Sequence, residues 1–433
     1  MRRRIFLLVL IVSMLGACLC GCSSTSETEK DSPTSIDNTE KLSSTPKEIS
    51  IWLWEDEEGV SKFLEDDWNS ANDDIKVNLE VVGYDVFHDK LITAISSGSA
   101  PDGWEIITGW LRELVNMDAV LPLNDYVNSW ELKDEIVPSV LDISKVEDIY
   151  YGVPYQNCSY YIYVNKQLFE DAGVKYPGTI GEFYEACDEL TRDTNGDGVI
   201  DTYGWGMRGA RNGHAMWSSI VFTDAGTGFL DAKENSMLLT EEVIAANERY
   251  INLFKNGHTP ATAPNDGMSE IVQNFKSGIT AMLEHHVMSS AGMVDALGEN
   301  VDVIEIPRNE SGYRFIPCEP CPVVINSKTE HPDEAFKYFA WYSSHDCCDK
   351  INSKLGQIPA TKSVMDLPYY TDNKFMKLSM DVLPEAIDVP KSMTWGEWAE
   401  VTWPQTFQRA LMGEIDSAEM MKVLNDKLVE GMK

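Results

Sequence analysis

The spacing of apolar residues predicts alternating strands and helices in the first part of the chain. Strand-like runs alternate with apolar residues at the spacing of one helix face. The expected elements are a strand at 49–54, a helix at 60–68, a strand at 77–82, a helix at 87–95 and a strand at 104–108. This order indicates a parallel α/β sheet. Ligands of such sheets lie beyond the carboxyl ends of the strands.

Later segments extend the same pattern. Strands are expected at 301–306 and 323–326, and helices at 332–342 and 417–432. The chain has 433 residues, of which 43% are hydrophobic, which is enough for more than one core. We therefore expect two lobes.

The charge of the chain excludes some partners. The formal net charge is -35, from 35 basic and 70 acidic residues. Such a surface repels nucleic acid and keeps the protein soluble through self-repulsion. A nucleic-acid partner is therefore not expected, and we expect a monomer.

The first residues have the pattern of an export signal. Arginines at 2–4 precede an apolar run at 5–17, which is too short for a permanent membrane helix of about 20 residues. The segments LGAC, ending at Cys18, and LCGC, ending at Cys22, both resemble the lipobox of bacterial lipoproteins. We favour Cys22 as the acylated residue because the polar tether starts directly after it. The alternative is an ordinary secretory signal with incidental cysteines.

The start of the chain therefore divides into two predicted segments. Residues 1–21 are expected to be a lipoprotein signal peptide. Residues 22–46 are rich in Ser and Thr with few apolar residues, so they are expected to form a disordered tether. A lipid and a tether would hold a globular body at the extracellular face of the cell membrane.

An ordered set of short motifs resembles the extracellular solute-binding proteins of ABC importers, family 1, related to maltose-binding protein. The motifs are YDVFHDKLITAISSGSAPD at 84–102, AVLPLN at 119–124, YGVPY at 151–155, YVNKQLF at 163–169, AGV at 172–174, FKSGITAM at 275–282 and GQIP at 356–359. Each motif alone is weak, but the ordered set is specific and spans most of the chain.

This resemblance implies a two-lobed periplasmic-binding-protein type II clamp. Each lobe would contain a mixed, mostly parallel sheet flanked by helices. Lobe 1 would take residues 47–156 and a returning segment at about 318–371. Lobe 2 would take residues 157–317 and C-terminal helices at about 372–433. A solute bound between the lobes would favour closure and be presented to an ABC permease, with no chemistry on the solute.

Aromatic residues point to a carbohydrate solute. Sugars stack their C–H faces on flat rings, and their hydroxyl groups pair with carboxylates, amides and His. The strand-end rule selects Trp54, Glu55 and Trp110, with core packing as the alternative for each Trp. The segment MTWGEWAEVTW at 393–403 offers Trp395 and Trp398, of which one is expected to touch ligand. A buried cluster is the alternative.

The remaining ligand candidates are Tyr155, Asn157, Trp217, Glu284 and His286. Tyr155 and Asn157 follow the crossing motif, so the resemblance implies that they line the floor of the cleft. Glu284 and His286 follow the FKSGITAM segment, where relatives often present a ligand-facing residue, although Gly and Trp are more common there. Trp217 is a candidate from the second lobe, with a core role equally open.

The segment DTNGDGVID has the spacing of a calcium loop. Asp193, Asn195, Asp197 and Asp201 supply side-chain oxygens and Val199 a carbonyl, with Gly at the sixth position. The twelfth position is Gly rather than Glu, so a remote carboxylate would have to complete the shell, as in the loop of galactose-binding protein that this one resembles. The expected Ca²⁺ would be structural; a metal-free turn rich in Asp and Asn is the alternative.

Six cysteines follow the signal, at 158, 187, 318, 321, 347 and 348. An exported protein can hold disulfides, and a link from the 318/321 pair to the 347/348 pair is one expectation. Free buried thiols are the other.

Two other functions fit the composition. A glycoside hydrolase can also be acidic, rich in Trp and exported, and its two catalytic carboxyl groups can lie far apart in sequence. A clamp for a non-sugar solute, such as a peptide or polyol, is the third possibility. We find no nucleophile elbow or phosphate loop, and the ordered motifs of the family favour a binding protein rather than an enzyme.

Overall fold

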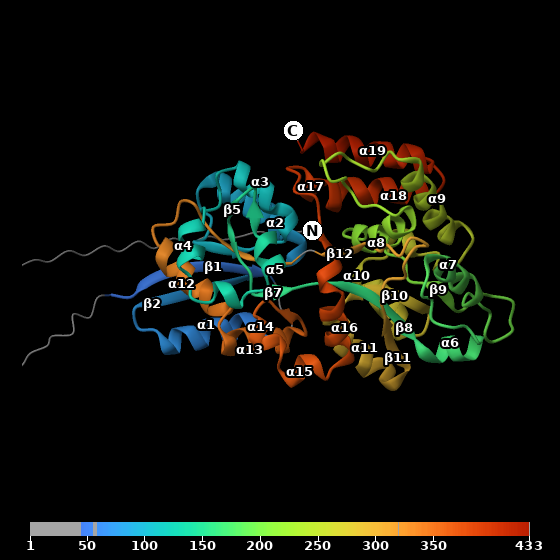
Figure 1. The fold of residues 1–433 in the computed structure, drawn as a ribbon, viewed down its shortest axis with the longest axis horizontal. Helices are drawn as coiled ribbons and strands as arrows, with labels where there is room; N and C mark the ends of the chain where they lie inside the picture. Colours follow the sequence, from blue (N-terminus) through green and yellow to red (C-terminus); the bar gives the residue numbers. More distant parts are fainter. Residues whose placement is uncertain (1–44, 55–58, 319, 433) are drawn as a thin grey trace, which may run out of the picture. The chain divides into compact units, whose positions relative to one another are not determined.

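The computed structural model describes residues 45–54, 59–318 and 320–432. These residues form two larger β-sheets, each with its own helices, and three two-stranded sheets (Figure 1). The predicted signal peptide, most of the tether, Cys18, Cys22 and Glu55 lie outside the described residues.

The first sheet has five strands in the order β2-β1-β3-β13-β6. Their bounds are β1 Lys47–Trp54, β2 Ile75–Val82, β3 Gly103–Glu105, β6 Gly152–Val153 and β13 Val323–Ile325. Apolar residues alternate along β1, so Ile49, Ile51 and Leu53 pack on one face. The other face packs Trp104, Phe87 and Val324.

Helices pack on both faces of this sheet. They are α1 Val60–Ala71, α2 Tyr84–Ser97, α3 Leu111–Asn116, α4 Asn124–Ser129, α5 Pro138–Ile143, α12 Pro332–Tyr342 and α13 His345–Leu355. Between β3 and α3, a 3-10 turn covers Thr108–Trp110. Strands β4 Lys145–Val146 and β5 Ile149–Tyr150 form a small hairpin. We call this body lobe 1.

The second sheet has four strands in the order β11-β8-β10-β9. Their bounds are β8 Tyr160–Asn165, β9 Tyr203–Trp205, β10 Thr280–His286 and β11 Val301–Ile304. The helices here are α6 Lys166–Ala172, α7 Ile180–Glu189, α8 His214–Ala225, α9 Glu241–Lys255, α10 Met268–Lys276 and α11 Ser290–Leu297. We call this body lobe 2.

The C-terminal part of the chain packs mainly on lobe 2. Its helices are α14 Lys362–Met365, α15 Pro368–Thr371, α16 Lys374–Val382, α17 Trp395–Glu397, α18 Trp403–Leu411 and α19 Ser417–Glu430, with one π-helical turn at Trp398–Thr402. Phe407, Leu424 and Leu428 share one buried cluster with Trp217 of α8. This cluster makes the C-terminal helices part of the lobe 2 core.

Short strand pairs link the two lobes. They are β7 Gln156–Asn157 with β14 Ile358–Pro359, and β12 Ile316–Cys318 with β15 Ala386–Asp388. We call these segments the crossing strands. They provide the connection about which two lobes can rotate.

The two separate sheets confirm the two-lobed α/β fold, but the sheets are less parallel than expected. Strands β1, β2 and β3 pair parallel, and β9 pairs parallel with β10. In contrast, β13 and β8 pair antiparallel with both of their neighbours. The physical reason is topological: β8 and β13 each enter their sheet from a crossing segment rather than through a strand-helix-strand unit.

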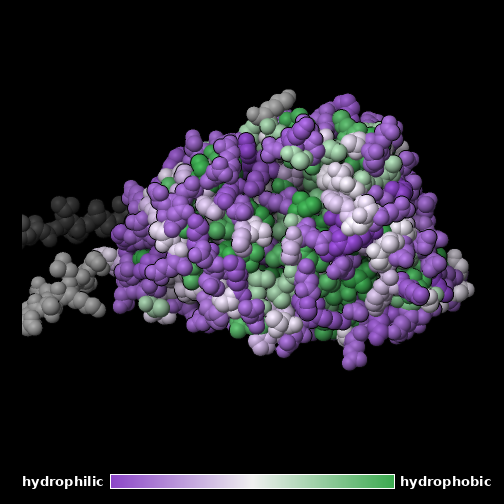
Figure 2. Space-filling model, in the orientation of Figure 1, coloured by the Kyte–Doolittle hydropathy of each residue, from purple (hydrophilic) through white to green (hydrophobic). Residues whose placement is uncertain are grey.

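The surface agrees with the acidic composition. Hydrophilic residues cover most of the face seen in Figure 2, and hydrophobic residues gather near its middle, around the region of β7, β10 and α16. Among the described residues, none of the helices has the length and apolar character that a membrane crossing requires.

Candidate functional site

Aromatic rings gather at the carboxyl ends of β1 and β2 in lobe 1. Trp54 is the last residue of β1 and is partly exposed. Its ring packs edge-on against Tyr84 at 5.5 Å and against Trp110 at 6.1 Å between centroids. Trp110 is fully buried, so Trp54 and Tyr84 carry the exposed part of this cluster. Tyr84 was not predicted as a site residue, although it lies two residues after the end of β2.

His88 lies one turn along α2 from Tyr84. Its ring packs on Trp110 at 4.7 Å, and its Nε2 lies 3.0 Å from Oε2 of Glu113. Burial acts to lower the pKa of His88, but the hydrogen bond and charge of Glu113, helped by Glu400, outweigh burial and raise it. Because Glu400 belongs to the C-terminal part, the charge of lobe 2 reaches this edge of lobe 1.

Polar side chains gather at the matching edge of lobe 2. β9 and β10 run parallel, so their carboxyl ends lie at one edge of the sheet. Glu284 and His286 lie near the end of β10, and Arg208 follows β9. Arg208 was missed in the sequence because the three-residue strand β9 was not predicted there.

Burial keeps these two β10 side chains uncharged near neutral pH. It raises the pKa of Glu284 to about 8, against the lowering effects of Ser219 and Arg208. Burial, with the nearby charge of Arg208, also lowers the pKa of His286 to about 4. Among the described residues, Oε1 of Glu284 and Nδ1 of His286 are buried without a hydrogen-bond partner. A neutral carboxyl group can both donate and accept, which suits the hydroxyl groups of an uncharged solute.

Tyr160 extends this polar edge. It is the first residue of β8 and is partly exposed, and its ring lies edge-on to His286 at 6.0 Å between centroids. In the sequence, nothing distinguishes Tyr160 from the other residues of the β8 run.

Tyr155 and Asn157 belong to the packed interior of the crossing region. The hydroxyl of Tyr155 donates to the carboxylate of the buried Glu105, and Gln156 donates to the same hydroxyl at 3.0 Å. Oδ1 of Asn157 accepts the N–H of Cys158 at 2.7 Å. Both predicted residues are thus buried by contacts that hold the crossing strands, and neither lines an open floor in this structure.

Trp217 and Trp398 lie in the core of lobe 2. The indole N–H of Trp217 donates to Oδ1 of Asn247 at 2.7 Å, and that of Trp398 donates to the carbonyl of Leu424 at 2.8 Å. Both side chains are fully buried. For Trp217, whose core role was left equally open by the sequence, apolar packing and a buried hydrogen bond favour the core alternative.

Trp395 occupies a different position from its neighbours. Its ring stacks on Trp398 at 4.8 Å and 10°. It also contacts Gly109 of lobe 1. Of the two tryptophans predicted in this segment, Trp395 is therefore the one at the boundary between the lobes.

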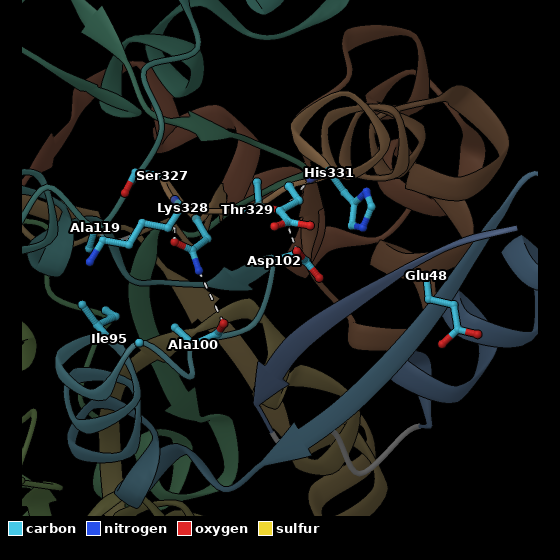
Figure 3. A pocket seen from close by; sticks show the side chains of 12 residues that line it. Glu48, Ile95, Ala100, Asp102, Ala119, Ser327, Lys328, Thr329 and His331 are labelled. Carbon is cyan, nitrogen blue, oxygen red and sulfur yellow. Dashed lines mark hydrogen bonds between the residues drawn. The ribbon is translucent and has the colours of Figure 1, made fainter.

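A separate surface pocket of about 340 Å³ lies at the opposite end of the lobe 1 strands (Figure 3). Glu48 near the start of β1, Asp102 just before β3 and Asn326 just after β13 line it. The Asp102 carboxylate already accepts hydrogen bonds from Ser50 and Thr329. Because solutes of such sheets bind beyond the carboxyl ends of the strands, we do not assign the solute site to this pocket.

The predicted calcium loop is an exposed turn between α7 and β9. The Asp193 carboxylate accepts N–H groups of Gly196, Asp197 and Gly198, and Asp201 accepts from Thr194. Among the described residues, no three His, Cys, Asp or Glu side chains lie close enough to hold a metal ion. The loop does keep oxygen donors at alternate positions, which is the donor chemistry that Ca²⁺ prefers. Calcium binding stays a prediction.

Among the described residues, the six cysteines form no disulfide, and each except Cys321 is buried. The expected link between the 318/321 and 347/348 pairs is therefore wrong. Cys318 lies on β12, where its Sγ donates to the carbonyl of Cys158 at 3.0 Å. Cys347 and Cys348 lie on another element, α13, and burial raises the pKa of both thiols.

Two sheets joined by crossing strands, one with aromatic groups and the other with neutral polar groups at its strand ends, define a hinged binding protein. The chain belongs to the bacterial extracellular solute-binding protein family, whose model matches residues 54–346.

Three relatives illustrate this membership. A putative binding protein of Brucella abortus (strain 2308) is 27% identical over 346 residues, which cover 80% of this chain and 82% of the relative. An arabinooligosaccharide-binding protein of Halalkalibacterium halodurans is 25% identical over 322 residues, covering 71% and 70%. The solved structure of an ABC transporter solute-binding protein from Thermotoga lettingae, bound with α-D-tagatose, has a TM-score of 0.79 at 20% identity and covers 89% of this chain and 100% of its own. Its similarity confirms the two-lobed fold.

Proposed function

We propose that the protein captures a carbohydrate between its two lobes and delivers it unaltered to an ABC permease, as a monomer outside the cell membrane. Two observations carry this proposal: the partly exposed aromatic cluster around Trp54 at the strand ends of lobe 1, and the neutral polar groups Glu284 and His286 at the strand ends of lobe 2. Rings stack on the C–H faces of sugars, and neutral groups bind hydroxyls without the cost of burying a charge. The arabinooligosaccharide and tagatose named for two relatives support a sugar as solute.

A melting panel tests this function. The protein lacking residues 1–44 is heated with monosaccharides and oligosaccharides, including arabinooligosaccharides, and with peptides and polyols. A bound solute adds RT ln(1 + [L]/Kd) to stability, about 2.7 kcal/mol at a hundredfold excess over Kd. We expect a sugar to raise the melting temperature and to be recovered intact by chromatography. Shortened products would support the glycoside hydrolase instead, and a shift with peptides or polyols alone would support a non-sugar clamp.

We further propose that lipid on Cys22 anchors the protein. A Cys22→Ala variant expressed in a Gram-positive host should appear in the culture medium, whereas the parent chain should stay with the membrane fraction. Immunoblots of both fractions measure the difference, and Cys18→Ala is the matched control. If the Cys18→Ala variant appears in the medium and the Cys22→Ala variant does not, the acylated residue is Cys18.

We also propose that the loop from Asp193 to Asp201 binds a structural Ca²⁺. At 1 mM Ca²⁺ and a Kd of about 1 μM, the ion would add about 4 kcal/mol, so a chelator should lower the melting temperature by about 4 °C or more. Differential scanning calorimetry with and without chelator measures this shift. Asp197→Asn should remove the difference, whereas Asp231→Asn, in another exposed turn, should keep it. If the parent chain has the same melting temperature with and without chelator, the loop is a metal-free turn and the calcium proposal is wrong.

A further inference from the structure

Gly109 leaves room for an aromatic ring from the other lobe. It lies in the 3-10 turn of lobe 1, between β3 and α3. A Cβ atom at this position would lie 2.1 Å from Cδ1 and 2.5 Å from Nε1 of Trp395. Real Cβ atoms essentially never approach other atoms below 3.0 Å. In this arrangement of the lobes, any residue with a side chain at 109 must therefore displace Trp395.

The ring of Trp395 is packed tightly against other aromatic rings of lobe 2. Besides stacking on Trp398, its ring packs edge-on against His214 and against Phe229, each at 5.3 Å. The whole side chain is buried. A ring packed this densely cannot yield without disturbing the lobe 2 core, so the lobes themselves would have to separate.

Neighbouring contacts join the same surfaces of the two lobes. A Cβ atom on Gly396 would lie 3.5 Å from Cδ1 of Trp110 and 3.6 Å from Cε1 of His88, an ordinary contact distance. Nδ2 of Asn212 in lobe 2 lies 3.4 Å from the hydroxyl of Tyr84 in lobe 1. Gly109 and Trp395 are therefore the tightest point of a wider contact between the lobes.

We propose that Gly109 is a positioning residue for solute capture: its missing side chain lets Trp395 seat against lobe 1 and so permits the closed state. This proposal rests on the proposed clamp function. The capture of a solute shared by both lobes depends on the fraction of molecules able to close, so a residue that blocks closure weakens affinity without touching the solute.

Gly109→Ala tests the proposal. Gly109 does not have a positive φ, so its backbone accepts alanine. We expect the Kd for the sugar found in the melting panel to rise at least tenfold, while the melting temperature of the unliganded protein changes by less than about 2 °C. Gly396→Ala is the matched control, because its Cβ finds ordinary contact distances; its Kd should change less than twofold.

A second variant separates a blocked closure from a damaged fold. Trp395→Ala removes Cδ1, Nε1 and Cγ, the three atoms that a Cβ on residue 109 would meet. In the Trp395→Ala background, adding Gly109→Ala should change Kd less than twofold. An unchanged Kd in Gly109→Ala, a large drop in its unliganded melting temperature, or the same loss of affinity in the Trp395→Ala background would each overturn the proposal.

A ligand-independent measurement keeps the inference testable if no sugar binds. Fluorophores on unnatural amino acids at Asn128 of lobe 1 and Lys255 of lobe 2, both exposed, report the distance between the lobes by single-molecule energy transfer. Gly109→Ala should lose the closed population that the parent chain visits without solute. If no sugar binds but Gly109→Ala still loses the closed population, only the proposed function is overturned. If the parent chain and Gly109→Ala give identical distance distributions, the proposed role of Gly109 is overturned.

Discussion

Replacing Trp54 with alanine should weaken sugar affinity by about tenfold to a hundredfold, or about 1.4–2.8 kcal/mol. Trp54 is the only tryptophan among the predicted site residues whose ring is partly exposed in the described structure. A stacked ring loses both its apolar contact area and its aromatic contact with the C–H face of the sugar. Isothermal titration calorimetry with the sugar identified in the melting panel measures the change.

Trp52→Ala is the matched control for this prediction. Trp52 lies two residues earlier on β1, so it points to the same face of the sheet, and it is also partly exposed. Its ring packs edge-on against Phe87 at 6.4 Å, and the Lys90 ammonium lies 4.2 Å from its centroid. Trp52→Ala should lower stability while changing Kd less than threefold. Equal losses of affinity in the two variants would mean that the aromatic cluster acts through the fold of lobe 1 and not through contact with solute.

The position of Trp54 was predictable because it depends only on local sequence and one topological rule. The apolar alternation of β1 and β2 fixes where each strand ends, and parallel pairing brings those ends together. Arg208 was not predictable in the same way, because β9 is only three residues long and shows no alternation. Antiparallel pairing of β8 and β13 was missed for a related reason: the direction of a strand that enters from a crossing segment depends on the whole chain path.

The tryptophans of the C-terminal segment show a second limit. Trp395 and Trp398 share the same neighbouring residues in the sequence, and a Trp side chain can pack in a core as well as line a cleft. Their roles differ only through partners far away in the sequence, Gly109 for Trp395 and the carbonyl of Leu424 for Trp398. A sequence pattern records local spacing and carries no information about such partners. The contact between the lobes was therefore invisible before the structure.

Replacing Glu284 with glutamine should make the protein more stable at pH 8 and leave its stability nearly unchanged near pH 4.5. Burial raises the pKa of this carboxyl group to about 8 in the folded protein, from 4.5. Between these values the folded chain keeps a proton that the unfolded chain has lost, so the free energy of unfolding falls as pH rises from about 4.5 to about 8. The full loss is at most about 5 kcal/mol, at 1.36 kcal/mol per pKa unit.

Urea unfolding at pH 5, 6, 7 and 8 measures this effect as the difference between Glu284→Gln and the parent chain. Since glutamine cannot ionise, this difference should grow steadily with pH and level off above about pH 8; other titrating groups cancel because they are common to both chains. Glu248→Gln, at an exposed position of α9, is the matched control and should follow the parent chain at every pH. A constant difference across the range would mean that Glu284 is already ionised at neutral pH. The edge of lobe 2 would then present a buried negative charge, which would favour a cationic solute over the neutral sugar proposed for this site.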